Sequence, residues 1–223
     1  MGFKIFINAG HFSGRNTPPY EDSGHVEIFI DGTTIQENVI VRAIRDELKL
    51  LLTKYEVLYV PDELNLKDSI AWVNQTATLQ DFAIDIHLNA HSNRQVSGTE
   101  AFYWKDPKYA KVLSRSVSDV LWIKNRGAIS DTQSYLGSLG WLRFLKCPSV
   151  VLECYYLSNI GDRAKGSVQR AAQGIKNGID ELFQLQEEIK IEIIKTEVGR
   201  LQQIIEILKK IAFLQDLINK YKK

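Results

Sequence analysis

The pattern of apolar and polar positions changes near residue 168, and the two parts of the chain predict different structures. In the first part, apolar runs of strand length predict β-strands at residues 4–9, 56–60, 82–88, 98–104 and 149–154. Apolar residues at helical spacing predict helices at residues 35–54, 67–78 and 109–122, with a loop at 12–33. Strands that alternate with helices predict an α/β fold with a mostly parallel central sheet flanked by helices.

From residue 168 onward the pattern is helical and predicts a long C-terminal helix. Its apolar positions step by 3 and 4 residues, the spacing of a coiled-coil seam: Ile191, Ile194, Val198, Leu201, Ile205 and Leu208. The step then shortens in a phase slip through Ile211 and Leu214. Further apolar residues widen this face: Ile193, Ile204, Ile207, Phe213 and Leu217. We therefore expect a compact domain at 1–185 and a coiled-coil tail at 186–223. Such a tail either packs on its own domain or assembles with copies of itself, and we favour assembly.

Composition and charge exclude several classes of function. The net charge of +1 offers no basic field that would attract nucleic acid or an anionic membrane. Two cysteines, Cys147 and Cys154, are too few for a disulfide framework. No apolar run reaches the ~20 residues that span a bilayer, and the N-terminus does not have the pattern of a signal peptide. We expect a soluble protein without an export signal, a nucleic-acid partner or a membrane span.

Two histidines and two glutamates stand at or beside the ends of predicted elements. They are His11 after strand 4–9, Glu37 near the start of helix 35–54, His87 near the end of strand 82–88, and Glu153 near the end of strand 149–154. In open α/β sheets, sites collect beyond the C-terminal ends of the strands. Three such side chains can hold a catalytic zinc ion with one coordination position open, while the fourth moves protons.

Glu37 also has a purely structural explanation. Residues 34–37 fit a capping box, in which Glu37 would close the N-terminus of the helix instead of binding a metal. In that case the ligand role would pass to Glu21 or Glu27 in the preceding loop.

His87 has candidate supporting residues on its own strand. Strand alternation puts Asp85 and Asn89 on the same face as His87, where either could hold the imidazole ring. His91, four residues beyond His87, is expected to lie in a loop.

The other two site residues also have ordinary alternatives. His11 could be a loop histidine bound to a backbone carbonyl, and Glu153 could be paired with a Lys or Arg at the strand end. An unpaired carboxylate at the end of an apolar strand is costly unless it is needed. Cys154 is not expected to be a nucleophile, because it alternates away from Glu153 and no histidine is placed to activate it.

Four segments match, in order, the motifs of a known family. They are NAGH ending at His11, QEN around Glu37, IHLNA around His87 and VLECYYLSN around Glu153. With the elements between them, they make the chain resemble the zinc-dependent N-acetylmuramoyl-L-alanine amidases, in particular the phage endolysin type. The resemblance extends from about residue 4 to about residue 182. One departure is Tyr155, where a glycine is common in the family.

The resemblance implies a role for each residue of the site. His11, Glu37 and His87 would bind Zn²⁺, and Glu153 would be the catalytic residue that takes a proton from water and returns it to the leaving amine. The substrate would be the amide between N-acetylmuramic acid and L-alanine in bacterial peptidoglycan. Residues 1–185 would be the zinc amidase catalytic domain, and 186–223 would make the protein a homo-oligomer.

The same resemblance implies a place of action. An endolysin without a signal peptide would be made in the host cytoplasm and would act on the cell wall after the membrane is permeabilised. Two other hypotheses stay open at this point. The metal site could serve a different amide, as in another metallo-amidase or a peptidase, or the chain could be a non-catalytic wall-binding or assembly protein on the same fold.

Overall fold

The computed structural model of the chain describes residues 3–14, 21–29 and 32–221. Their elements, in chain order, are β1 Lys4–Ala9, β2 Val26–Ile28, β3 Thr34–Gln36, α1 Glu37–Leu51, β4 Glu56–Tyr59, α2 Leu66–Thr76, β5 Phe82–Asn89, β6 Thr99–Tyr103, α3 Lys108–Leu121, β7 Asn125–Ser130, the 3₁₀ turn η1 Asp131–Gln133, α4 Gly140–Phe144, β8 Ser149–Tyr156, α5 Ile160–Lys165 and α6 Val168–Tyr221.

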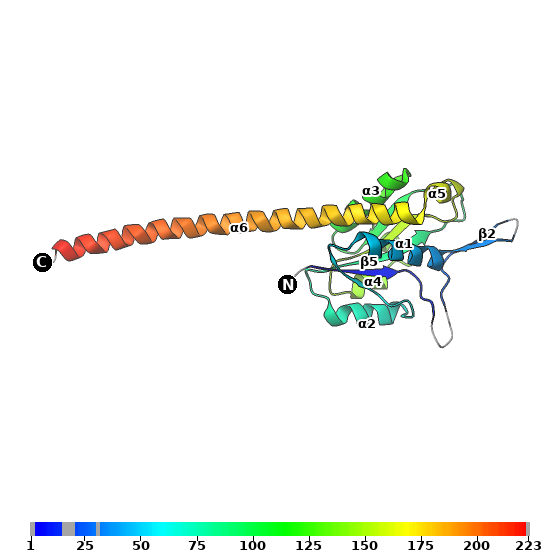
Figure 1. Cartoon of the computed structure of the whole chain (residues 1–223), viewed down its shortest axis with the longest axis horizontal. Helices are drawn as coiled ribbons and strands as arrows, with labels where there is room; N and C mark the ends of the chain where they lie inside the picture. Colours follow the sequence, from blue (N-terminus) through cyan, green and yellow to red (C-terminus); the bar gives the residue numbers. More distant parts are fainter. Residues whose placement is uncertain (1–2, 15–20, 30–31, 222–223) are drawn as a thin grey trace. The chain divides into compact units, whose positions relative to one another are not determined.

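A six-stranded sheet of order β4-β1-β5-β8-β6-β7 forms the centre of the fold. β4, β1, β5 and β8 are parallel neighbours, whereas β6 is antiparallel to β8 and parallel to β7. Helices lie on both faces of the sheet, with α2 and α4 on one side and α3 and the beginning of α6 on the other (Figure 1). The predicted α/β class with a mostly parallel sheet is confirmed.

Both faces of the central strands are buried, as expected for parallel strands covered by helices. On β1, Phe6 packs into a cluster with Val73 of α2 and Trp141 of α4. Its neighbours Ile5 and Ile7, which alternate to the other face, are also fully buried. This double burial explains why the strands read as continuous apolar runs.

The beginning of α6 packs closely on α3 because glycine stands at the contact. A Cβ atom at Gly174 would lie 2.7 Å from the Cα atom of Val117, and one at Gly178 would lie 2.9 Å from a Cδ atom of Leu113. The missing side chains therefore set the distance between these two helices.

The entrance to α1 differs from the prediction. Residues 34–36 form β3, which pairs antiparallel with β2 inside the stretch predicted to be a loop. The helix therefore begins at Glu37, and its N-cap Gln36 makes no side-chain cap hydrogen bond. The capping-box explanation is wrong, because Thr34 lies in a strand and not at the cap. Residues 15–20 and 30–31 of the predicted loop lie outside the described residues.

A second difference is β7, a strand that is not among those predicted from the sequence. Its residues are exposed or half-buried, so it has no apolar run, and it forms the edge of the sheet beside β6. Parallel pairing with β6, and not its own pattern, makes it a strand.

A bulge in β8 accounts for Tyr155. His87 pairs with Glu153 and Asn89 pairs with Tyr156, so β8 has one extra residue at this point. The extra residue restores Tyr156 to the side of Glu153, where both line a cavity, and Tyr155 does not line it. Tyr155 is 2% exposed, and its ring lies against Gly166. The tyrosine found where the family commonly has glycine is therefore a core residue outside the cavity.

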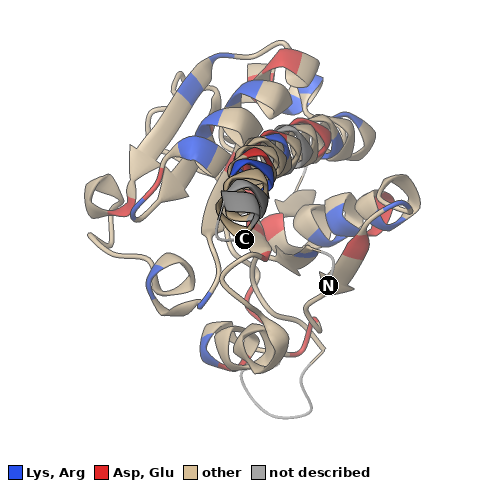
Figure 2. Cartoon of the chain, turned by 90° about the vertical axis from the view of Figure 1, so that its left-hand side faces the viewer, with Lys and Arg blue, Asp and Glu red and all other residues tan. Residues whose placement is uncertain are grey.

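The chain separates by packing into two compact units, Met1–Asp180 and Glu181–Lys223. In the second unit, every large apolar side chain that the structure describes from Ile189 to Ile218 is between 47% and 65% exposed. No helix among the described residues is long and apolar enough to cross a membrane. Basic and acidic residues are interspersed over the elements in the view of Figure 2, in keeping with the net charge of +1. The predicted domain boundary after residue 185 stays a prediction.

The contact between Tyr155 and Gly166 can be tested with Gly166→Ala. The new Cβ atom would lie 2.7 Å from the Tyr155 ring, which is too close for a buried aromatic side chain to accommodate. We expect a loss of about 1–3 kcal/mol in the free energy of unfolding, measured by denaturant titration. Gly140→Ala is the control, since its Cβ atom would meet nothing closer than 3.4 Å. Equal stability of the two variants would contradict the packing described for Tyr155.

Candidate metal centre and active site

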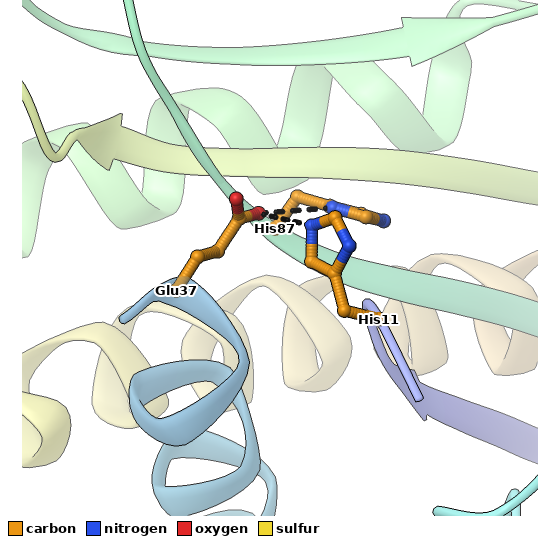
Figure 3. A group of neighbouring side chains, drawn as sticks. All are labelled: His11, Glu37 and His87. Atoms are coloured by element: carbon orange, nitrogen blue, oxygen red, sulfur yellow. Dashed lines mark hydrogen bonds and ion pairs between the residues drawn. The ribbon is translucent and has the colours of Figure 1, made fainter. Parts of the chain in front are cut away.

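Three side chains from separate elements converge beyond the C-terminal ends of β1 and β5 (Figure 3). Oε1 of Glu37 lies 3.1 Å from Nε2 of His11 and 3.1 Å from Nδ1 of His87. The three residues offer ligand atoms that all lie within 4.8 Å of one another. The structure thus brings together the three residues predicted to bind a metal, and neither Glu21 nor Glu27 belongs to this group.

Glu37 is positioned by backbone groups as well as by the two histidines. As the first residue of α1 it is only 4% exposed. Its Oε2 accepts a hydrogen bond from the backbone N–H of His25 (2.9 Å), and its Oε1 accepts one from the N–H of Leu88 (3.0 Å). Burial alone would raise the pKa of Glu37, but hydrogen bonds from His11 and His87 hold it well below its usual range.

Each histidine is held between Glu37 and an outer aspartate. Nδ1 of His11 lies 2.8 Å from Oδ2 of Asp22, and Nε2 of His87 lies 3.2 Å from Oδ2 of Asp85. Asp85 is itself held by the side-chain amide of Asn8, which donates to its Oδ1 at 2.7 Å. Carboxylates in this position fix the ring orientation and the tautomer of metal-binding histidines.

The two outer aspartates differ in how far the sequence predicted them. Asp85 was one of two candidates for supporting His87, and it is the one that contacts the ring. Asp22 was not predicted, because it lies in a loop with no periodicity and reaches His11 across eleven residues. Only its acidic side chain near a candidate ligand could have drawn attention to it.

Asn89, the other candidate, has different partners. Its side-chain N–H group donates to Oε1 of Glu100 at 2.6 Å, and its Oδ1 accepts from the N–H of Ala90. Glu100 also accepts hydrogen bonds from the Tyr156 hydroxyl and from Arg126. This second buried cluster lies across the strand pair from Glu153, because Glu100 of β6 is its register partner.

Glu153 lies directly opposite His87 in the pairing of β5 and β8. Its Oε2 is buried and, among the residues that the structure describes, has no hydrogen-bond partner. Burial raises the pKa of Glu153 to about 8, His87 opposes this, and the negative charges of Glu37 and Glu100 add to it. The alternative of a simple ion pair fails in the described part of the chain, since no Lys or Arg pairs with this carboxylate there.

Glycines make room for the two imidazole rings. A Cβ atom at Gly10 would lie 2.4 Å from the His87 ring, and one at Gly24 would lie 2.5 Å from the His11 ring. Gly24 has φ +63°, and His11 itself has φ 68°, a backbone conformation that side-chain-bearing residues rarely adopt. The two rings therefore occupy space that a side chain at residue 10 or 24 would fill.

The other candidate residues make contacts that have a structural explanation. Glu27 is buried and pairs with Arg94 and His25, away from the three converging residues. Nδ1 of His91 accepts a hydrogen bond from the N–H of Asn93 within its own loop. Burial raises the pKa of the Cys154 thiol, and the residue is fully buried, so it does not suit a nucleophile.

A cavity of about 950 Å³ connects these groups. It is lined by His11, His87 and Glu153 and by the carboxylates of Asp22, Asp85 and Glu100. Two imidazole nitrogens and one carboxylate oxygen are ligands that zinc takes in catalytic sites, with a further position left for water or substrate. The donor set, the outer aspartates and the acidic lining all fit a divalent metal ion.

Comparison with known proteins identifies the family. A family model described as N-acetylmuramoyl-L-alanine amidase matches residues 5–181. The chain belongs to this family. The match covers all four motifs of the site and ends close to the end of the first compact unit. It supports peptidoglycan amidase activity for the chain.

Several solved amidase structures share the fold. The catalytic domain of the amidase CwlV from Paenibacillus polymyxa is 25% identical, with a TM-score of 0.65 over 82% of this chain and 99% of that one. AmiC2 of Nostoc punctiforme is 22% identical, with a TM-score of 0.65 over 82% and 97%. The catalytic domain of the CD27L endolysin targeting Clostridia difficile is 23% identical, with a TM-score of 0.57 over 81% and 98%. No curated protein gives a significant match to this chain.

The glycine beside His87 offers a test of the converging geometry. Gly10 does not have a positive φ, so the backbone tolerates alanine and the effect of Gly10→Ala comes from the collision with the His87 ring. We expect zinc affinity to fall by a factor on the order of 10 to 100, as for loss of a supporting contact, while circular dichroism stays unchanged. Gly140→Ala is the control and should leave metal affinity unchanged, because its Cβ atom meets nothing closer than 3.4 Å. Equal metal affinity of the two variants would show that metal binding does not depend on this position of the His87 ring.

Proposed function

We propose that the chain is a zinc-dependent N-acetylmuramoyl-L-alanine amidase that hydrolyses the bond between N-acetylmuramic acid and the L-alanine of the stem peptide. One observation carries this proposal. The family's amidase match coincides with a cavity in which three potential zinc ligands converge beside Glu153, a buried carboxylate with an unpartnered oxygen. A buried oxygen without a hydrogen-bond partner does not stabilise the fold, but it is free to accept a proton.

In this proposal Nε2 of His11, Oε1 of Glu37 and Nδ1 of His87 hold the metal, since these atoms face one another. Zinc, when bound, supplies Lewis acidity that polarises a carbonyl group and lowers the pKa of water at the site to about 7. Asp22 and Asp85 keep the opposite ring nitrogens occupied, so that each imidazole presents one fixed nitrogen to the metal.

Glu153 is the proposed general base and acid. Its raised pKa favours the protonated form when no cation is near, and a divalent cation at the neighbouring ligands would favour the carboxylate. The carboxylate then accepts the proton of the attacking water at Oε2 and delivers it to the nitrogen of the leaving L-alanine. Glu100 keeps its own hydrogen bonds with Asn89, Tyr156 and Arg126 and takes no proton in this scheme.

We further propose that the biological role is lysis of the cell wall as an endolysin. The CD27L endolysin catalytic domain shares the fold, and a long helix continues beyond the matched residues of this chain. The enzyme would be made in the host cytoplasm and would act on the wall after the membrane is permeabilised. The tail, with its apolar side chains half exposed, would join copies of the chain into a homo-oligomer.

The metal ligands are tested by His11→Ala and His87→Ala in the full chain. Each removes one nitrogen donor, so stoichiometric zinc, measured by atomic spectroscopy, and hydrolysis of purified cell wall should both be lost. Chelation of the wild type should abolish activity, and added zinc should restore it. His91→Ala is the matched control for metal content, because its ring is bound in a loop contact outside the three converging residues, and it should keep stoichiometric zinc. Full activity of metal-free protein would overturn the zinc proposal.

The role of Glu153 is tested by Glu153→Gln, which keeps the shape and removes the proton acceptor. Zinc content should stay at one equivalent, while turnover on muropeptides falls by a factor on the order of 10² to 10⁴. Free peptides without the muramyl group serve as the comparison substrate and separate this amidase from a peptidase. Loss of zinc in the variant would instead make Glu153 a ligand, and unchanged turnover would remove it from the reaction.

A further inference from the structure

Part of the apolar face of the second compact unit, residues 181–223, here called the tail, has a mirror symmetry along the chain. Counted outward from the midpoint between residues 204 and 205, eight apolar residues form four pairs at equal distances in the two directions, whereas Ile189, Ile193, Ile207, Phe213 and Leu217 have no apolar mirror partner. The symmetric pairs are Ile204 and Ile205, Leu201 and Leu208, Val198 and Ile211, and Ile191 and Ile218. Ile194 and Leu214 miss this symmetry by one residue. The eight paired residues therefore form the same pattern when the helix is read in either direction.

The residues of these pairs are free to meet a partner. Each of them is between 47% and 58% exposed in the single chain. Soluble monomers rarely expose contiguous apolar patches of more than a few hundred Å² unless the patch is a binding surface. A cover for the seam is therefore required.

The charges of the tail are divided between its two halves. Residues 181–204 contain five acidic and three basic residues, 3 − 5 = −2, and residues 205–223 contain two acidic and five basic residues, 5 − 2 = +3. Two copies lying in the same direction would put like charges side by side. Two copies in opposite directions put the negative half of each beside the positive half of the other.

We propose that the tail is covered by a second copy of itself in antiparallel orientation, with a two-fold axis between residues 204 and 205. A two-fold interface is self-complementary, so that residue i contacts residue j and residue j contacts residue i. The mirror-symmetric pairs meet this requirement. Ile191 of one copy packs beside Ile218 of the other, and Leu201 packs beside Leu208.

A parallel coiled coil explains these features less well. It has no need for mirror symmetry, and it would align the like-charged halves. The antiparallel pair uses both the symmetry and the charge division.

The relative orientation of the two helices determines the distance between the two copies of residue 191. Residues 191 and 218 are 218 − 191 = 27 positions apart, about 40 Å along a helix that rises 1.5 Å per residue. In the antiparallel pair the two copies of Ile191 are separated by about this distance, whereas in a parallel pair they are adjacent. A disulfide forms only when Cβ atoms come within about 4.5 Å.

The inference rests on the proposed self-association of the tail and not on the proposed catalysis. Hydrolysis of cell wall tests the proposed catalysis, whereas the mass in solution and cross-linking test the self-association of the tail. Cross-linking is specific here, because the native thiols of Cys147 and Cys154 are buried. A new cysteine on the tail will therefore be the reactive one.

The experiment uses Ile191→Cys and Ile218→Cys, made separately in the full-length chain. Each variant is oxidised alone, and both are oxidised after mixing and subunit exchange. We expect disulfide-linked dimers in the mixture, at least tenfold more than from either variant alone, because only residues 191 and 218 of different copies meet. Light scattering of the wild type at micromolar concentration should give the mass of at least two chains.

Gln203→Cys is the matched control, since it lies beside the proposed axis but on the polar side of the helix, and it should remain unlinked. Circular dichroism checks that each variant stays folded. Efficient linking of Ile191→Cys with itself would make the tail parallel and overturn the proposal. A monomeric mass of the wild type would overturn it as well, whatever the outcome of the wall assay.

Discussion

The Glu37 carboxylate accepts backbone hydrogen bonds at both of its oxygens and contacts two imidazole rings, while it is 4% exposed. A buried charge is tolerated only when it is paired and hydrogen-bonded. Meeting that requirement at Glu37 draws together the end of β1, the β2–β3 hairpin, the first turn of α1 and the end of β5. Glycines at positions 10 and 24 are part of the same constraint, because any larger residue would occupy the space of the rings.

Two glutamates of the site have opposite surroundings. Around Glu37, hydrogen-bond donors outweigh burial and hold its pKa low, so the side chain stays a carboxylate. Around Glu153, burial and neighbouring negative charges raise the pKa to about 8, so its proton is easily gained and lost near neutral pH. Groups whose environments push their pKa values apart are suited to different tasks. The surroundings of Glu37 favour the charged carboxylate, whereas those of Glu153 favour the protonated carboxyl group.

The sequence predicted the α/β class, most sheet strands and the position of His11 and His87 at strand ends, because strand periodicity is a local property. The grouping of Glu37 with these two histidines was predicted from the family resemblance. The sequence did not predict β7, whose pairing comes from its neighbour, or the hairpin that delivers Glu37. Asp22 escaped notice because its contact with His11 depends on how a loop folds. The bulge at Tyr155 could not be read from spacing either, since a one-residue register change appears only when β8 is paired with β5. The predictions therefore failed where tertiary contact, and not local pattern, decides the structure.

β8 is the last strand in the chain but lies inside the sheet, between β5 and β6. During synthesis, therefore, the sheet stays split into two parts with open edges until residue 156 has been made. Glu153 enters the cavity only with that final insertion. Long-range strand pairing of this kind is slow and leaves edges exposed in the meantime. Completion of the fold and completion of the site are one event, so a nascent or truncated chain that ends before β8 contains His11, Glu37 and His87 but lacks Glu153, the proposed general base.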